Sequence, residues 1–267
     1  MPELPEVETV RRGLEPVMQG SRFVEVETHR PDLRWPLPAD FSQRLIGGTV
    51  RALRRRAKYL IAEVSTGEAL LMHLGMSGSF EIQHRGPGPF ALHDHVIFHM
   101  SNGATVVFND PRRFGSMWLF DDVDSTRNPT FRLGPEPLEE RFGAEVLADA
   151  FRGRRAPLKA TLLDQRLVAG LGNIYVSEAL HRARLSPRRA SGTLVGTSPV
   201  PKPQLRALLR AIRDTLNDAL LDRPDGGDRF RVYDREGERC PRRGCRGTIK
   251  RIVQSGRSTF FCPLCQR

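Results

Sequence analysis

The chain has 267 residues, of which 39% are hydrophobic and 27% charged, a balance that indicates folded units rather than a disordered chain. No apolar run approaches the roughly 20 residues that span a bilayer. The first ten residues carry three glutamates where a secretory signal would be apolar, so we expect a cytoplasmic protein. Lysine and arginine outnumber the acidic residues by 42 to 31, and this net charge of +11 favours a polyanionic partner, although a generally basic protein fits it too.

The first part of the chain opens with a helical pattern and then becomes strand-like. A helix begins at Pro5, and one face of it carries Val7, Val10 and Leu14. Short runs rich in Val, Ile, Leu and Phe follow, separated by Gly-containing turn dipeptides. Strands are predicted at residues 69–72, 95–100 and 104–109. These features favour a β-sandwich.

The remainder of the chain is helical and then rich in cysteine. A Gly-Pro linker occupies residues 133–138. Helices are predicted at residues 162–167, 174–184 and 204–221. The pattern therefore predicts an α+β fold in three parts, with ranges 1–125, 126–228 and 229–267.

Four cysteines near the end of the chain have the spacing of a zinc site. Four residues separate Cys240 from Cys245, two separate Cys262 from Cys265, and sixteen lie between the pairs. Two ligand pairs on tight turns at the end of a hairpin suit one tetrahedral zinc ion, which four thiolates would make structural. The hairpin strands are expected at residues 248–253 and 258–261. Two disulfides are the alternative, but nothing indicates an oxidising compartment.

The last 39 residues hold much of the positive charge, with eleven Lys and Arg against three acidic residues. For most of these side chains a solvated basic face is a sufficient explanation. Arg257 differs because it lies on the predicted hairpin just before the second cysteine pair. A rigid hairpin could direct its guanidinium at a phosphate.

The opening residues 1–6, with two prolines and two glutamates, have both a structural and a chemical interpretation. Pro and Glu suit a helix N-terminus. If Met1 is removed, however, Pro2 carries a free secondary amine, and a terminal amine is far less protonated at pH 7 than a lysine. Such an amine can attack a sugar C1′ to form an iminium, with Glu3 as acid or base. These six residues alone favour the structural interpretation.

Residues 1–14, together with the cysteine spacing, resemble the Fpg/Nei family of formamidopyrimidine-DNA glycosylases. The resemblance runs nearly from end to end, and the order and spacing of its motifs make it specific. The motifs are RRAKYL at 55–60, HLGMSG at 73–78, HDH at 93–95, NDPRRFG at 109–115, GPEP at 134–137, GLGNIY at 170–175 and VYDREG at 232–237.

The resemblance implies an N-terminal β-sandwich with flanking helices, then a helix-two-turns-helix domain with a zinc-finger hairpin, and DNA in the cleft. It implies that Pro2 is the nucleophile, that Glu3 protonates the sugar ring oxygen and that Glu6 supports the N-terminus through a hydrogen bond. The other implied catalytic residues are Lys58 and Arg257. Implied DNA contacts are Met76, His93, Arg112, Arg113, Phe114 and Asn173, and the zinc ligands are Cys240, Cys245, Cys262 and Cys265.

Within this resemblance, Lys58, Asn173 and Arg257 grip phosphates, while Met76, Arg112 and Phe114 fill the gap left by an extruded nucleotide. Plainer interpretations exist for each group. Met76 and Phe114 could be sandwich core residues, Lys58 could belong to a basic face, and residues 170–173 could form a bare turn between helices.

The expected function is a monomeric glycosylase and lyase that removes formamidopyrimidines and 8-oxoguanine from duplex DNA, with one structural zinc. A non-catalytic damaged-DNA binding protein and a glycosylase for oxidised pyrimidines are the alternatives. The chain departs from the family at residues 221–230, where a Gly-rich loop looks shortened by roughly a dozen residues. A weaker preference for 8-oxoguanine is therefore expected.

Overall fold

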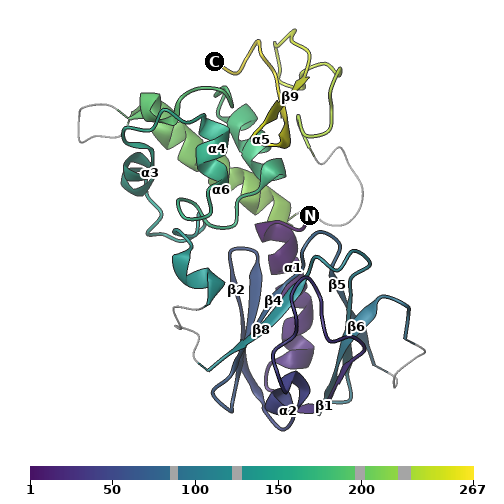
Figure 1. The fold of residues 1–267 in the computed structure, drawn as a ribbon. Helices are drawn as coiled ribbons and strands as arrows, with labels where there is room; N and C mark the ends of the chain where they lie inside the picture. Colours follow the sequence, from purple (N-terminus) through teal and green to yellow (C-terminus); the bar gives the residue numbers. More distant parts are fainter. Residues whose placement is uncertain (85–89, 122–127, 196–201, 222–229) are drawn as a thin grey trace. The chain divides into compact units, whose positions relative to one another are not determined.

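The computed structural model describes residues 1–84, 90–121, 128–195, 202–221 and 230–267. The chain divides into two compact units, Met1–Arg132 and Leu133–Arg267 (Figure 1). No helix among the described residues is long and apolar enough to cross a membrane. The finer division of the second unit at residue 229 stays a prediction.

The first unit contains one long helix and two four-stranded antiparallel sheets (Figure 1). The sheets have the strand orders β1-β6-β7-β5 and β2-β3-β4-β8. Among the described residues of this unit, the helical elements are α1 (Leu4–Met18), α2 (Phe41–Leu45) and a 3-10 turn at Pro129–Arg132. The strands are β1 (Phe23–Thr28), β2 (Val50–Arg56), β3 (Tyr59–Val64), β4 (Ala69–His73), β5 (Ser79–Gln83), β6 (Asp94–Met100), β7 (Thr105–Asn109) and β8 (Ser116–Phe120).

Side chains from both sheets and from α1 share one apolar core. Val7 and Leu14 of α1 are each 1% exposed, and they belong to the same cluster as Phe98 of the first sheet and Leu70 of the second. Burial of these surfaces supplies the main driving force for closing the sheets on each other. The predicted β-sandwich is confirmed, and the predicted strands at 69–72, 95–100 and 104–109 correspond to β4, β6 and β7.

The part of the second unit that the structure describes before its hairpin contains four helices and a 3-10 turn, and α5 packs against α4 and α6. The helices predicted at 174–184 and 204–221 are confirmed as α5 and α6. The helix predicted at 162–167 is wrong, because α4 ends before Asp164, whose carboxylate accepts the Arg166 backbone N–H at 3.0 Å. The elements are α3 (Ala144–Phe151), α4 (Leu158–Leu163), α5 (Asn173–Arg182), the turn Ser191–Leu194 and α6 (Pro203–Leu221).

The unit ends in an antiparallel hairpin of β9 (Lys250–Gln254) and β10 (Arg257–Phe261), which confirms the predicted hairpin. Ser255 and Gly256 connect the strands with φ angles of 49° and 72°. Two successive residues with positive φ form the type I′ turn that matches the twist of a tight hairpin. Arg257 therefore lies at the turn, and the cysteines lie at the opposite end of the strands.

Candidate functional site

A capping box holds the amino end of the chain at the start of α1. The Glu3 backbone N–H donates to the Glu6 carboxylate at 2.9 Å, and the Glu3 carboxylate accepts the Glu6 N–H. Glu3 is 2% exposed, whereas Pro2 is half-buried. The expected Glu6 hydrogen bond is present, and it fixes the backbone beside Pro2. A capping box is also what a purely structural helix start shows, so both interpretations share this geometry.

Lys58, in the turn between β2 and β3, lies near His73, the last residue of β4 in the second sheet. Lys58 follows Ala57, whose φ is 53°, in the turn between β2 and β3, and it is only 8% exposed. A solvated basic face therefore does not describe Lys58. Burial, together with the positive charges of Lys58 and Arg34, lowers the pKa of His73 to about 4. His73 is thus neutral near pH 7, and its Nδ1 accepts the Gly75 N–H at 3.0 Å.

This low pKa predicts an acid sensitivity of the first unit. The His73 pKa falls from 6.5 to about 4 on folding. The unfolded chain therefore binds more protons between these values, and the folded state loses stability as pH falls through this window, by at most about 3 kcal/mol. His73→Gln keeps an acceptor but does not titrate. We expect its urea midpoint to fall less than that of the parent between pH 7 and 4.5. Equal falls would contradict this assignment.

Asp110 holds together the two loops that carry most of the predicted DNA contacts. It is fully buried, and its carboxylate accepts the Ser77 hydroxyl at 2.5 Å and the Gly115 N–H at 2.7 Å. Ser77 belongs to the loop of Met76, and Gly115 to the loop that begins at Asp110. A buried carboxylate is stable only when donors satisfy it, so the two loops are fixed to each other.

The same two loops meet backbone to backbone at Gly75. Its φ is 62°, and a Cβ there would lie 2.2 Å from the carbonyl carbon of Phe114. Only glycine meets both conditions. Met76 is 43% exposed and Phe114 is 36% exposed, so the alternative that both are core residues is wrong.

Two arginines contact the ring of Phe114. The guanidinium carbon of Arg112 lies 4.8 Å from the ring centroid, and that of Arg34 lies 5.6 Å from it. Arg34 also donates its backbone N–H to the Gly115 carbonyl at 3.0 Å. Cations over an aromatic face attract the ring quadrupole. The exposed ring is therefore held in a fixed and strongly positive setting.

His93 and Arg113 lie at the same loops. The His93 carbonyl accepts the Asp110 N–H at 3.0 Å, and Arg113 has a φ of 53° in the turn that follows. Arg113 is exposed, with its Nη1 3.6 Å from the Asp32 carboxylate. Five predicted contact residues of the first unit thus share one surface region: Met76, His93, Arg112, Arg113 and Phe114.

If Phe114 has the role that the family resemblance implies, we expect Phe114→Ala to impair the extrusion of a damaged base. Stacking of an aromatic side chain on a base contributes about 1–3 kcal/mol, so kcat/KM should fall about 5- to 150-fold. Fluorescence of a 2-aminopurine next to the lesion measures extrusion directly. Val24→Ala is the control, because Val24 is an apolar residue on β1 that is even more exposed (53%) than Phe114. If both variants extrude the base at the parent rate, Phe114 is not a wedge.

In the second unit, Asn173 lies beside the hairpin that carries Arg257. Asn173 is the first residue of α5, and its side-chain amide donates to the Ser258 carbonyl at 3.0 Å. The fully buried Lys159 donates to the same carbonyl at 2.8 Å and to the Thr259 hydroxyl at 2.6 Å. Arg257 itself is exposed. The structure therefore brings Asn173 and Arg257 together at a helix N-terminus, a place where backbone N–H groups favour phosphate.

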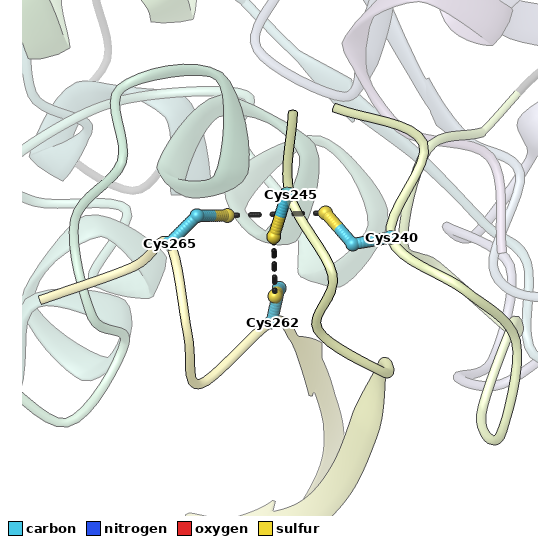
Figure 2. A group of neighbouring side chains, drawn as sticks. All are labelled: Cys240, Cys245, Cys262 and Cys265. Carbon is cyan, nitrogen blue, oxygen red and sulfur yellow. Dashed lines mark hydrogen bonds between the residues drawn. The ribbon is translucent and has the colours of Figure 1, made fainter. Parts of the chain in front are cut away.

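The four cysteines form one cluster at the other end of the hairpin (Figure 2). Cys240 and Cys245 precede β9, and Cys262 and Cys265 follow β10, with all four sulfurs within 4.8 Å of one another. The Cys240–Cys265 and Cys245–Cys262 pairs are 3.8 and 3.7 Å apart. Sulfurs around a tetrahedral zinc ion lie about 3.8 Å apart, given Zn–S bonds of about 2.3 Å. The cysteines are free, so the disulfide alternative is wrong.

Family models match most of the chain. Residues 1–117 match the formamidopyrimidine-DNA glycosylase N-terminal domain, 133–227 its H2TH domain, and 237–267 the zinc finger found in FPG and IleRS. The chain belongs to the formamidopyrimidine-DNA glycosylase family. The zinc-finger match and the four sulfurs agree on a site for one structural zinc ion.

Named relatives of this family align with the whole chain. The formamidopyrimidine-DNA glycosylase of Azorhizobium caulinodans is 54% identical, with 100% of both chains covered. The Lactococcus lactis enzyme bound to DNA with an AP site is 32% identical, with a TM-score of 0.87 and 100% of both chains covered. A mutant of the L. lactis enzyme with DNA containing Fapy-dG gives the same values.

Several residues that organise the glycosylase fold were not predicted from the sequence. Asp110, Arg34 and Lys159 hold loops or the hairpin, and Glu178 on α5 binds the backbone at the start of the finger. A signal existed for Asp110, which follows a buried strand directly and precedes a basic loop. No local pattern marked the others.

Proposed function

We propose that this chain is a DNA glycosylase and abasic-site lyase that removes oxidised bases, formamidopyrimidines and 8-oxoguanine, from duplex DNA. The observation that carries this proposal is the Pro2-Glu3 start, held by its capping box, in a chain that aligns from end to end with formamidopyrimidine-DNA glycosylases. Its partner is double-stranded DNA with a damaged base or an abasic site. The place of action is then the bacterial cytoplasm, where the chromosome lies.

In this mechanism Met1 has been removed, so Pro2 carries a free secondary amine. Its nitrogen bonds through its lone pair to C1′ of the damaged nucleotide and then gives up its N–H proton. The glycosidic bond breaks with its electron pair on the base, which takes up a proton. Glu3 protonates the ring oxygen, so the sugar opens to an iminium. Loss of the C2′ proton expels the 3′ phosphate, and loss of the C4′ proton expels the 5′ phosphate. Water hydrolyses the iminium and frees Pro2, which leaves a one-nucleotide gap.

The remaining site residues act on the DNA. We propose that Lys58, Asn173 and Arg257 bind phosphates around the extruded nucleotide. The burial of Lys58 and the position of Asn173 at a helix N-terminus support this assignment. Met76, Arg112 and Phe114 occupy the space in the duplex, and His93 and Arg113 contact the strands beside it. The exposure of Met76 and Phe114 supports that role.

Borohydride trapping on DNA with one abasic site tests the function. An iminium enzyme should be reduced to a stable covalent adduct, and peptide mapping should place that adduct on an N-terminal Pro2. The rival, a damaged-DNA binding protein, should bind the same duplex without an adduct or strand cleavage. Binding without either product would overturn the proposal.

We further propose that the segment before the finger affects which lesion is preferred. Residues 222–229, which make up most of the segment at 221–230 that looks shortened, lie outside the described residues. The alignment with the A. caulinodans relative extends over 295 positions against 267 residues here, which supports a loss of chain somewhere. We expect single-turnover excision to favour formamidopyrimidine over 8-oxoguanine, with thymine glycol as the third substrate. A large preference for 8-oxoguanine would contradict this expectation.

A further inference from the structure

A fully buried histidine lies against the zinc cluster. His181 is on the last turn of α5 and is 0% exposed. Its Nε2 lies 3.3 Å from Sγ of Cys240, which is itself only 4% exposed. Its Nδ1 is also buried and has no hydrogen-bond partner among the described residues. His181 is not one of the four expected zinc ligands, and the proposed glycosylase mechanism does not use it.

We propose that His181 is a positioning residue of the zinc centre, in which its Nε2–H donates a hydrogen bond to the Cys240 thiolate. A thiolate bound to zinc carries no proton, so it can only accept, and the proton must lie on Nε2. The same tautomer leaves Nδ1 without a hydrogen. The other tautomer would bury an N–H at Nδ1 without an acceptor, which costs free energy. The position of the Cys240 sulfur and the absence of an acceptor for Nδ1 among the described residues therefore favour the tautomer of His181 that is protonated at Nε2.

The backbone around His181 supports a role in positioning. Arg242, between the first two cysteines, donates from Nη2 to the His181 carbonyl at 2.7 Å and to the Arg182 carbonyl at 3.1 Å. One turn earlier, the Glu178 carboxylate accepts the backbone N–H groups of Arg231, Val232 and Tyr233, each at 2.9 Å. The end of α5 therefore holds the finger at its opening segment, residues 231–233, and at its first cysteine turn.

The charge of the centre explains why a donor is useful there. Four thiolates and one Zn²⁺ carry a net charge of about −2, and burying that charge is costly unless donors compensate it. Cys245 accepts the Gly247 N–H at 3.4 Å. At the buried Cys240, the imidazole N–H provides compensation. Partners of this kind orient a ligand and typically change metal affinity 10- to 100-fold.

Zinc transfer to a chromophoric chelator tests the proposal on the full-length zinc-loaded protein. We expect His181→Phe, which keeps the ring volume but has no donor, to lose zinc about 10- to 100-fold faster than the parent. His181→Gln, which can still present an N–H, should lie between them. Ser177→Ala is the matched control, because Ser177 is buried on the same helix but donates only to the Asn173 carbonyl. It should release zinc at the parent rate.

Cobalt substitution separates a hydrogen bond to sulfur from looser packing. An N–H···S bond stabilises the sulfur lone pair, so its loss should shift the thiolate-to-Co²⁺ charge-transfer band of His181→Phe to longer wavelength. Ser177→Ala should leave the band in place. The proposal is overturned if the His181→Phe band stays at the parent position, or if both variants release zinc equally fast. Both readouts follow the metal, so they are independent of base excision.

Discussion

Pro2→Gln should abolish the covalent adduct with abasic DNA and lower single-turnover excision by at least about 10³-fold, the range seen when a covalent nucleophile is lost. Glutamine at the second position is too large for efficient removal of Met1, so the chain would begin with a primary amine one residue away from the reacting position. The capping box of Glu3 and Glu6 does not involve the Pro2 side chain, and the fold should persist. Intact mass, borohydride trapping and excision kinetics together check this.

Glu3→Gln makes a matched comparison at the neighbouring residue. Glutamine keeps an oxygen that can accept the Glu6 N–H, so α1 should still be capped, but it cannot protonate the sugar. Base excision should fall strongly, while cleavage of preformed abasic DNA should be less affected. Arg12→Gln, on an exposed face of the same helix, serves as the control. Normal excision by a Pro2→Gln protein that retains Met1 would remove Pro2 from the mechanism.

Removal of zinc should unfold the finger and abolish tight DNA binding. The apolar core of the finger is small: it consists of Val232, Ile249, Phe260, Cys240 and Cys262, with Tyr233 and the other two cysteines around it. Structural zinc contributes about 10–16 kcal/mol to folding in comparable modules. Without it the hairpin keeps its hydrogen bonds to Lys159 and Asn173, and the first cysteine turn keeps the Arg242 bonds to the end of α5, but no ion joins the two cysteine turns to each other.

Cys262→Ser and chelation of the parent protein should act alike. We expect DNA affinity to fall at least about 100-fold, since a disordered hairpin no longer presents Arg257 and the adjacent basic residues to phosphates. Titration calorimetry and metal analysis should report one zinc per chain in the parent and a return of binding when zinc, but not magnesium, is restored. Tight binding by the metal-free protein would show that the hairpin folds without its ion.

Features set by short stretches of chain could be predicted from the sequence. The cysteine spacing predicted the cluster because both ligand pairs lie on tight turns of one hairpin, and β4, β6 and β7 were visible as apolar runs. The helix predicted at 162–167 failed because an Asp164 turn competes with the helical pattern.

Contacts between distant parts of the chain could not be predicted in the same way. Asp110 and Ser77 are 33 residues apart, and His181 and Cys240 are 59 apart. In the sequence, Asp110 and His181 look the same as an aspartate or a histidine that is exposed to solvent. Only the packing of the folded chain determines that these two side chains are buried. The roles of Met76 and Phe114 came from family resemblance, and their exposure became visible only in the fold.

Gly75 has a mechanical consequence for the loops of Met76 and Phe114. Because its missing side chain lets the two main chains touch, neither loop can shift inward without pushing the other. The side chains of Met76 and Phe114 are therefore expected to move together, as one rigid unit, and not independently of each other. A single methyl group at position 75 would push the two loops apart and displace Met76 and Phe114 at the same time.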